Sequence, residues 1–183
     1  ATRSELGWPH DPFTIPKAIS NAWQNAGARG KADRTAWAAR LNRIDTVQKQ
    51  AFERQMSGVL PADWQDVFQA LKKSIADEPK KIATRQASQI TLDALVAAIP
   101  EMIGGSADLT GSNLTKAKCA NAISADDFTG NYIYYGVREH GMAAAMNGMT
   151  LHGGVIPFGG TFLIFTDYCR PSIRLSALMK QRV

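Results

Sequence analysis

The stretch NYIYYGVREHGMAAAMNGM, residues 131–149, decides the fold expected for this chain. It opens with aromatic, β-favouring residues at Tyr132–Tyr135 and continues as a small-residue segment, Arg138–His152, that favours a helix. Glu139 lies where the two meet. In open α/β sheets the carboxyl ends of the strands border the crevice that binds ligands. The stretch therefore predicts a strand and then a helix, with one carboxylate at a candidate site.

The elements around this stretch indicate an α/β fold. A helix is expected over Thr84–Ile99, with strands over Glu101–Ser106 and Val155–Phe158. From Phe162 onward the pattern is helical, with an interruption expected near Pro171. This order predicts a mostly parallel sheet with helices on both faces.

The composition changes at about Ile82, which divides the chain into residues 1–81, a helical and irregular segment, and residues 82–183, the α/β domain. The chain begins with Ala1 and stops at Val183 in an uncapped apolar segment. We therefore expect it to be a piece of a larger polypeptide.

Within the first segment, three prolines near the start indicate an irregular connector. A helix is then expected over Lys17–Ala26, broken by Gly27 and Gly30. Apolar residues recurring every three to five positions predict one helical stretch from about Lys31 to Met56. A short helix capped by Asp63 is expected next, over residues 64–72, followed by a charged linker over residues 72–81.

The bulk properties exclude several classes of protein. The formal net charge of +5 is spread along the chain without a run of basic residues, which argues against a nucleic-acid module. Cys119 and Cys169 lie far apart without a CxxC motif, which favours a reducing, cytoplasmic location over a disulfide scaffold or zinc site. No apolar stretch reaches the roughly 18 residues of a membrane helix, so no membrane association is expected.

Two interpretations of Glu139 remain open from its spacing. A carboxylate in the first turn of a helix is favoured as the anion, whereas burial against aromatic rings raises its pKa. A group held between these effects suits general acid–base chemistry. The alternative is an ordinary carboxylate at a helix start, paired with Arg138.

Phe162, Phe165 and Tyr168 are spaced three residues apart, which on a helix places three rings along one side. Together with an acid, such a ring wall suits a flat heteroaromatic cofactor, although core packing explains the same spacing. Gly159 and Gly160 precede the rings and permit close approach of backbone or ligand. His140 is expected to be packed or hydrogen-bonded and not a metal ligand.

The segment GGSADLTGSNLT, residues 104–115, follows a predicted strand and offers backbone N–H groups and hydroxyls suited to anions. It is neither GxGxxG nor GxxxxGK[ST]. With ATRQAS at 83–88, the stretch at 131–142, LHGGVIPFGGTF at 151–162 and RLSALMKQR at 174–182, it closely resembles the transketolase family. The resemblance covers the first part of the pyrimidine-binding domain, preceded by the inter-domain segment.

This resemblance implies a role for each site residue. Glu139 matches the glutamate that hydrogen-bonds the aminopyrimidine of thiamine diphosphate and so promotes formation of the thiazolium ylid. Phe165, Phe162 and Tyr168 match the apolar wall around the pyrimidine ring. Asp108 matches a loop acid near the cofactor and the dimer interface. Arg85 and Ser112 match the family's substrate-phosphate ligands, although Gly111 stands where the family often has proline.

The resemblance also implies the reaction and the partners. The function expected is two-carbon ketol transfer from a ketose phosphate to an aldose phosphate in the pentose phosphate pathway. A homodimer is implied, with the active site at the subunit interface. The divalent metal, magnesium or calcium, is expected to bind a part of the parent enzyme, because the GDG…N motif is absent here.

On this basis the isolated chain is expected to be inactive. Three alternatives remain: a dihydroxyacetone synthase, a deoxyxylulose-phosphate-forming synthase, or a non-catalytic dimerisation domain that retains the fold. The loop SADLTGSN, residues 106–113, argues against the deoxyxylulose-phosphate-forming synthase.

Overall fold

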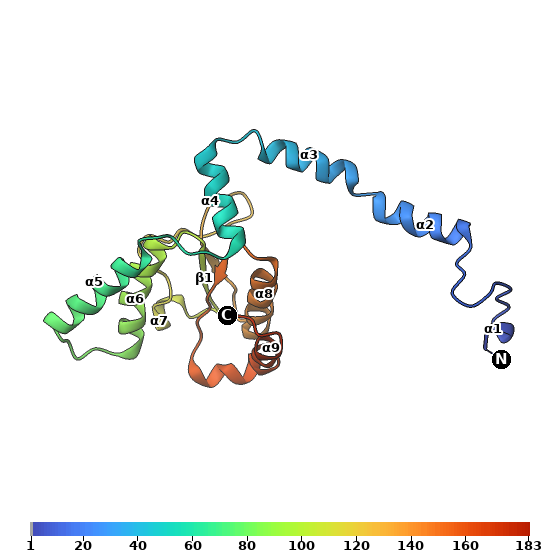
Figure 1. The fold of residues 1–183 in the computed structure, drawn as a ribbon. Helices are drawn as coiled ribbons and strands as arrows, with labels where there is room; N and C mark the ends of the chain where they lie inside the picture. The colour runs from blue at the N-terminus through green and yellow to red at the C-terminus, as the bar shows by residue number, and fades with distance from the viewer. Residues whose placement is uncertain (1) are drawn as a thin grey trace. The chain divides into compact units, whose positions relative to one another are not determined.

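The computed structural model describes residues 2–183, which fall into two compact units that meet between Lys49 and Gln50. Figure 1 traces the chain and labels its helices and strands. The boundary expected at about residue 82 concerns composition, whereas the unit boundary reflects packing, so the two need not coincide.

The first unit is helical. It contains α1 (Thr2–Glu5), α2 (Lys17–Ala28) and α3 (Lys31–Leu41), and α4 (Thr46–Ser57) begins in it. The single helical stretch expected from Lys31 is wrong, because the chain turns at residues 42–45. There Asp45 accepts a hydrogen bond from the backbone N–H of Gln48 (3.0 Å) and so starts a new helix. Gly27 lies inside α2, because one glycine costs a helix only about 1 kcal/mol.

The second unit begins with α4 and continues through α5 (Trp64–Asp77) and α6 (Thr84–Ala98), which pack against each other. The charged linker expected from residue 72 is wrong, because α5 continues to Asp77. Glu78 is non-helical (φ −128°, ψ 74°), as expected for a residue that precedes proline. Asp63 lies at the N-cap of α5, but its side chain makes no capping hydrogen bond.

Three parallel strands, in the order β2-β1-β3, form the sheet. The strands are β1 (Met102–Ser106), β2 (Tyr132–Tyr134) and β3 (Ile156–Pro157). Gly104 pairs with Tyr132, and Met102 pairs with Ile156. Figure 1 shows α5 and α6 on one side of β1 and α8 on the other. The expected α/β fold with a parallel sheet is confirmed.

The remaining elements are α7 (Thr110–Asn113), α8 (Glu139–His152), the 3₁₀ helix η1 (Leu163–Phe165) and α9 (Thr166–Leu178). The interruption expected near Pro171 is wrong, because this proline lies inside α9. An interior proline costs a helix about 3 kcal/mol. Here α9 packs along α8, and that packing offsets the cost.

The core of the second unit has two parts. One cluster joins α6 to the sheet and includes Val96, Met102 and Tyr132, which is fully buried. The other joins the end of β1 to α8 and α9 and includes Ala107, Met142 and Cys169. Glu139, the first residue of α8, therefore lies next to the second cluster.

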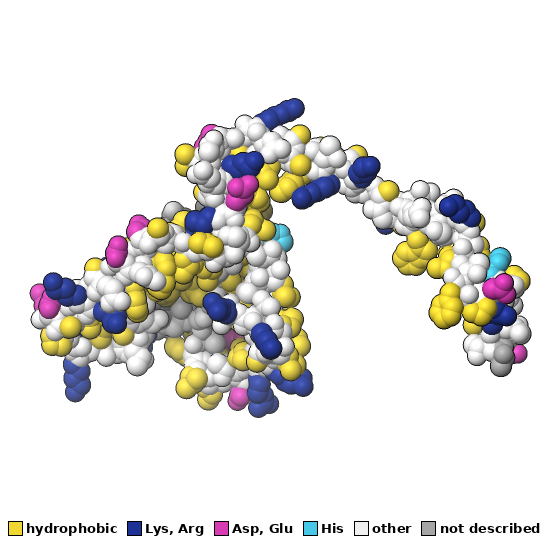
Figure 2. Space-filling model, in the orientation of Figure 1, with side chains coloured by type: hydrophobic (Ala, Val, Ile, Leu, Met, Phe, Trp, Pro, Cys, Tyr) yellow, Lys and Arg dark blue, Asp and Glu magenta, His cyan; other side chains and the backbone are white. Residues whose placement is uncertain are grey.

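The surface agrees with the charge pattern of the sequence. On the face drawn in Figure 2, the Lys and Arg side chains are spread out and form no continuous basic patch. Within residues 2–183, no helix is long and apolar enough to cross a membrane.

Candidate functional site

Glu139 is placed by the turn between β2 and α8. Gly136 adopts a left-handed conformation there (φ +66°), which glycine tolerates without strain. Arg138 donates a hydrogen bond from Nη1 to the backbone oxygen of Tyr135 (2.8 Å). Within residues 2–183 it forms no ion pair with Glu139, so the pairing considered as an alternative is not found.

A hollow of about 690 Å³ opens in front of Glu139. Its lining comprises the start of α8 and two aromatic rings: Val137, Arg138, Glu139, His140, Gly141, Phe165 and Tyr168. We call it the Glu139 hollow. The Glu139 side chain is largely buried, with the residue only 7% exposed, and the structure brings it together with two of the three predicted rings.

The aromatic residues form a continuous row. The ring centroids of Phe162 and Phe165 lie 5.9 Å apart, and those of Phe165 and Tyr168 lie 5.8 Å apart. The 3₁₀ helix at Leu163–Phe165 aligns Phe162 with Phe165, and Tyr168 follows in the first turn of α9. Phe162 is 40% exposed and Tyr168 65%, so these two rings are not core residues.

The Glu139 carboxylate has no polar partner of its own. It accepts no hydrogen bond and forms no ion pair within the described residues. Behind it, burial raises the pKa of the Cys169 thiol, and the nearby Glu139 carboxylate raises it further. The raised pKa favours the neutral form of the Cys169 thiol.

A second hollow, of about 490 Å³, brings together Arg85 and Ser112. Arg85 comes from the first turn of α6 and Ser112 from α7. Most of the other lining residues are polar or glycine, namely Thr84, Ser88, Asn113, Thr115, Gly159, Gly160 and Thr161. The remaining three are apolar: Ala83, Phe162 and Leu163. We call it the Arg85 hollow. Guanidinium and hydroxyl donors on one wall suit an anion such as a phosphate.

Several lining residues of the Arg85 hollow were missed from the sequence. The Thr161 hydroxyl is buried without a hydrogen-bond partner within residues 2–183. Ser88 lies one turn after Arg85 on the same helix, a spacing that helical periodicity offers as a signal. Thr161 follows the glycine pair directly, but no sequence pattern marks it as unpaired.

Asp108 is not brought into either hollow. It is exposed and adopts a left-handed conformation (φ +62°), which aspartate tolerates better than most residues. It lines neither the Glu139 hollow nor the Arg85 hollow. Its role near a cofactor or subunit interface stays a prediction.

The two glycines before the rings serve packing as well as the site. Both line the Arg85 hollow. A Cβ atom on Gly160 would collide with the Thr115 side chain, and one on Gly159 would lie 2.9 Å from Met146. Glycine at both positions therefore leaves room for the side chains of Met146 and Thr115, which lie close to where a Cβ atom would be.

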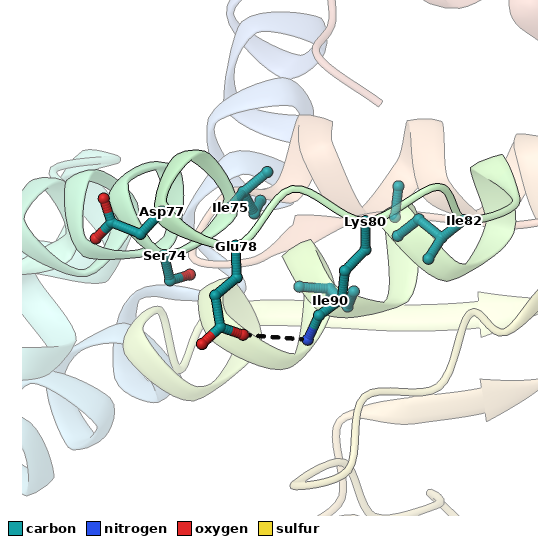
Figure 3. A pocket seen from close by; sticks show the side chains of 8 residues that line it. Ser74, Ile75, Asp77, Glu78, Lys80, Ile82 and Ile90 are labelled. Carbon is teal, nitrogen blue, oxygen red and sulfur yellow. Dashed lines mark ion pairs between the residues drawn. The ribbon is translucent and has the colours of Figure 1, made fainter.

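A third hollow, of about 570 Å³, lies between α5 and α6 and holds no residue predicted for function. Figure 3 shows its apolar side chains, among them Ile75, Ile82 and Ile90, beside an ion pair between Glu78 and Lys80 (3.5 Å). No group of His, Cys, Asp and Glu side chains within residues 2–183 is suited to a metal ion.

Comparison with known proteins gives one consistent result. Residues 80–183 match the family model "Transketolase, pyrimidine binding domain". The chain is 50% identical over 181 residues to the transketolase of Sinorhizobium medicae, covering 98% of this chain and 26% of that protein. It is 49% identical over 178 residues to the transketolase of Rhodobacter capsulatus, with 97% and 26% covered.

Solved structures agree with the sequence relatives. A transketolase from Leishmania mexicana aligns with a TM-score of 0.78 at 35% identity, covering 96% of this chain and 26% of that one. A transketolase from Pichia stipitis in complex with sedoheptulose-7-phosphate aligns with a TM-score of 0.80 at 32% identity, covering 96% and 27%. The chain thus spans about a quarter of the length of the relatives it matches.

Proposed function

Because this chain belongs to the transketolase family through its pyrimidine binding domain, we propose that it is the pyrimidine-binding part of a longer transketolase. The proposed reaction is reversible transfer of a two-carbon ketol unit from a ketose phosphate to an aldose phosphate. The observation that carries this proposal is that Glu139, which has no hydrogen-bond or ion-pair partner within residues 2–183, lines one hollow together with aromatic rings.

The residues of the Glu139 hollow fit the aminopyrimidine of thiamine diphosphate. The Glu139 carboxylate lines the hollow and has no hydrogen-bond partner within residues 2–183, so its oxygens are available to accept a hydrogen bond from a ligand. Phe165 and Tyr168 offer apolar surface for a flat ring beside that carboxylate. When bound, thiamine diphosphate supplies the carbon nucleophile and accepts the electrons of the cleaved carbon–carbon bond.

Glu139 is the proposed catalytic residue. It is the first residue of α8 and lines the hollow beside the rings of Phe165 and Tyr168. The carboxylate is thus set to share a proton with a ring nitrogen and so to promote proton transfer elsewhere on the heterocycle.

The Arg85 hollow is the proposed site for the substrate phosphate. Arg85 and Ser112 line it from two different elements, and Thr161 adds an unpartnered hydroxyl. The related Pichia stipitis enzyme was solved with a sugar phosphate, which supports the same substrate class here.

The subunit assembly, the cellular location and the metal site are proposed from membership of the transketolase family. We propose a cytoplasmic homodimer in which this part supplies one side of each active site. The divalent metal, magnesium or calcium, would then bind elsewhere in the full-length protein.

The test replaces Glu139 in the full-length protein that carries this chain. Glu139→Gln keeps the shape but removes the charge, so kcat should fall by about 10²- to 10⁴-fold. Glu53→Gln, an exposed glutamate on α4, is the matched control and should leave kcat unchanged. Full turnover by Glu139→Gln would contradict the proposal.

A further inference from the structure

Three small polar residues are buried between α8 and α9, the two helices that contribute Glu139 and Tyr168 to the Glu139 hollow. Ser172 is 1% exposed, and Asn147 and Ser176 are 6% exposed. Burying such groups costs free energy unless they are hydrogen-bonded, and alanine would fill much of the same space without that cost. Their presence in an otherwise apolar contact therefore requires an account.

The three residues form one connected network. Asn147 donates from Nδ2 to the backbone oxygen of Ser172 (3.0 Å). The hydroxyl of Ser176 lies 2.6 Å from Oδ1 of Asn147 and 3.0 Å from that same backbone oxygen. The hydroxyl of Ser172 lies 3.2 Å from Nδ1 of His140. The network thus runs along the contact of the two helices and ends at His140.

Both helices contribute side chains to the Glu139 hollow. His140 lines the hollow and directly follows Glu139 at the start of α8. Tyr168 lines it from α9 and lies four residues before Ser172, which places the two on one helix face. A shift of α9 along α8 would therefore change the spacing between the carboxylate and the rings.

Apolar packing alone leaves such a shift inexpensive. The apolar part of the contact includes Met142, Ala143 and Met146 of α8, and methionine adapts readily to altered neighbours. Hydrogen bonds are directional and are lost on small displacements. The polar network therefore sets the register of α9 on α8.

We propose that Ser172, Asn147 and Ser176 are positioning residues, which hold His140 and Glu139 at the correct distance from Phe165 and Tyr168. This inference rests on the proposed function, since it assigns the network to the same hollow. The three residues touch neither substrate nor cofactor and act through Glu139.

The test is a double-variant cycle in the full-length protein. Ser172→Ala should lower kcat by about tenfold, because small displacements of catalytic groups are costly. The KM for sugar phosphates should stay within about twofold, since Arg85 and Ser112 lie in the other hollow. The dissociation constant for thiamine diphosphate, measured by calorimetry, should rise about three- to tenfold.

Introducing Ser172→Ala into Glu139→Gln distinguishes positioning from general support. If Ser172 acts through Glu139, the second substitution should change the dissociation constant by less than about twofold. Independent effects that multiply would overturn the proposal. Ser74→Ala, which removes an exposed helical hydroxyl bonded to the Leu71 carbonyl, is the matched control and should change nothing.

The remaining outcomes are also decisive. If Ser172→Ala does not fold, the same cycle with Ser176→Ala decides, because that change removes one hydroxyl and leaves the contact with His140. A full-length protein without ketol transfer would contradict the proposed function alone. Unchanged affinity for thiamine diphosphate in the folded variant would overturn the positioning role alone.

Discussion

At the scale of single residues, two buried glutamates have opposite environments. Glu101 forms a bidentate pair with Arg54, with distances of 2.7 and 3.0 Å between their atoms. Glu139 has no such partner within residues 2–183. The paired carboxylate of Glu101 serves the fold, whereas that of Glu139 lines a hollow and stays available to a ligand, as the proposed function requires.

The ion pair between Glu101 and Arg54 predicts how the free energy of unfolding depends on pH. Burial alone raises the pKa of Glu101, but the hydrogen bond and charge of Arg54, with a backbone hydrogen bond, lower it overall below its ordinary value of 4.5. The stabilisation is therefore complete above pH 4.5 and is lost as the pH falls through the folded pKa. Urea unfolding between pH 7 and pH 3 should show this decline.

Glu101→Gln should remove most of that decline and cost about 1–3 kcal/mol at pH 7. The matched control is Glu78→Gln, because Glu78 pairs with Lys80 on the surface, where both side chains are more than two-thirds exposed. That change should cost less than about 1 kcal/mol. Equal effects at the two positions would contradict the role given to burial.

Arg85 carries a prediction about substrates. Arg85→Ala in the full-length protein should raise the KM for phosphorylated sugars by about 10- to 100-fold, since charged hydrogen bonds contribute about 1.5–3 kcal/mol. Unphosphorylated acceptors should be unaffected, because they lack the phosphate that we propose Arg85 binds. Arg43→Ala, an exposed arginine outside both hollows, is the control. Steady-state kinetics with both acceptor types checks this.

At the scale of elements, β1 contains two glycines against which aromatic side chains pack. A Cβ on Gly104 would collide with the Phe158 ring, and one on Gly105 would meet Tyr135 and lie 2.7 Å from the Ile133 backbone oxygen. The two glycines therefore let aromatic side chains from the flanking segments pack across the central strand. This packing holds the carboxyl end of the sheet, where the turn leading to Glu139 begins.

Gly105→Ala should therefore destabilise the fold by about 1–3 kcal/mol, because a backbone atom cannot move aside as a flexible side chain can. The control is Gly111→Ala, where a Cβ would meet nothing within 4 Å. That change should be neutral or slightly stabilising, since alanine restricts the unfolded chain. Denaturant unfolding of both variants compares the two, and an equal effect would argue against the collision.

At the scale of the whole molecule, residues 2–183 contain two hollows proposed for function but no group of side chains suited to a metal ion. One hollow places a carboxylate beside rings, and the other gathers donors for an anion. Since the relatives are about four times as long, we propose that other parts of the full-length protein supply what these hollows lack.

The isolated 183-residue chain should accordingly show no measurable ketol transfer. The physical reason is that thiamine diphosphate must also be held by its diphosphate and metal, for which this chain has no motif. A coupled assay on the purified chain, beside the full-length protein as positive control, checks the expectation. Turnover by the chain alone would refute it.

Local pattern predicted the elements well and their limits less well. The strand before Glu139 and the helix after it follow from residue types and periodicity. Two helix limits were misplaced because single residues decide them. The Asp45 side chain decides where α4 begins, and Pro79 decides that α5 ends at Asp77. Pro171 was misjudged since tertiary packing overrides propensity.

The sequence by itself determined that Glu139 starts a helix and that three rings follow at spacings that align them, because both depend only on neighbouring residues. Only the tertiary structure decided that Arg85 and Ser112 share a hollow that excludes Asp108. It also decided that Glu101 pairs with an arginine 47 residues away, whereas Glu139 pairs with none among residues 2–183. Such proximities depend on strand order and helix packing, and no local periodicity encodes which distant side chains meet.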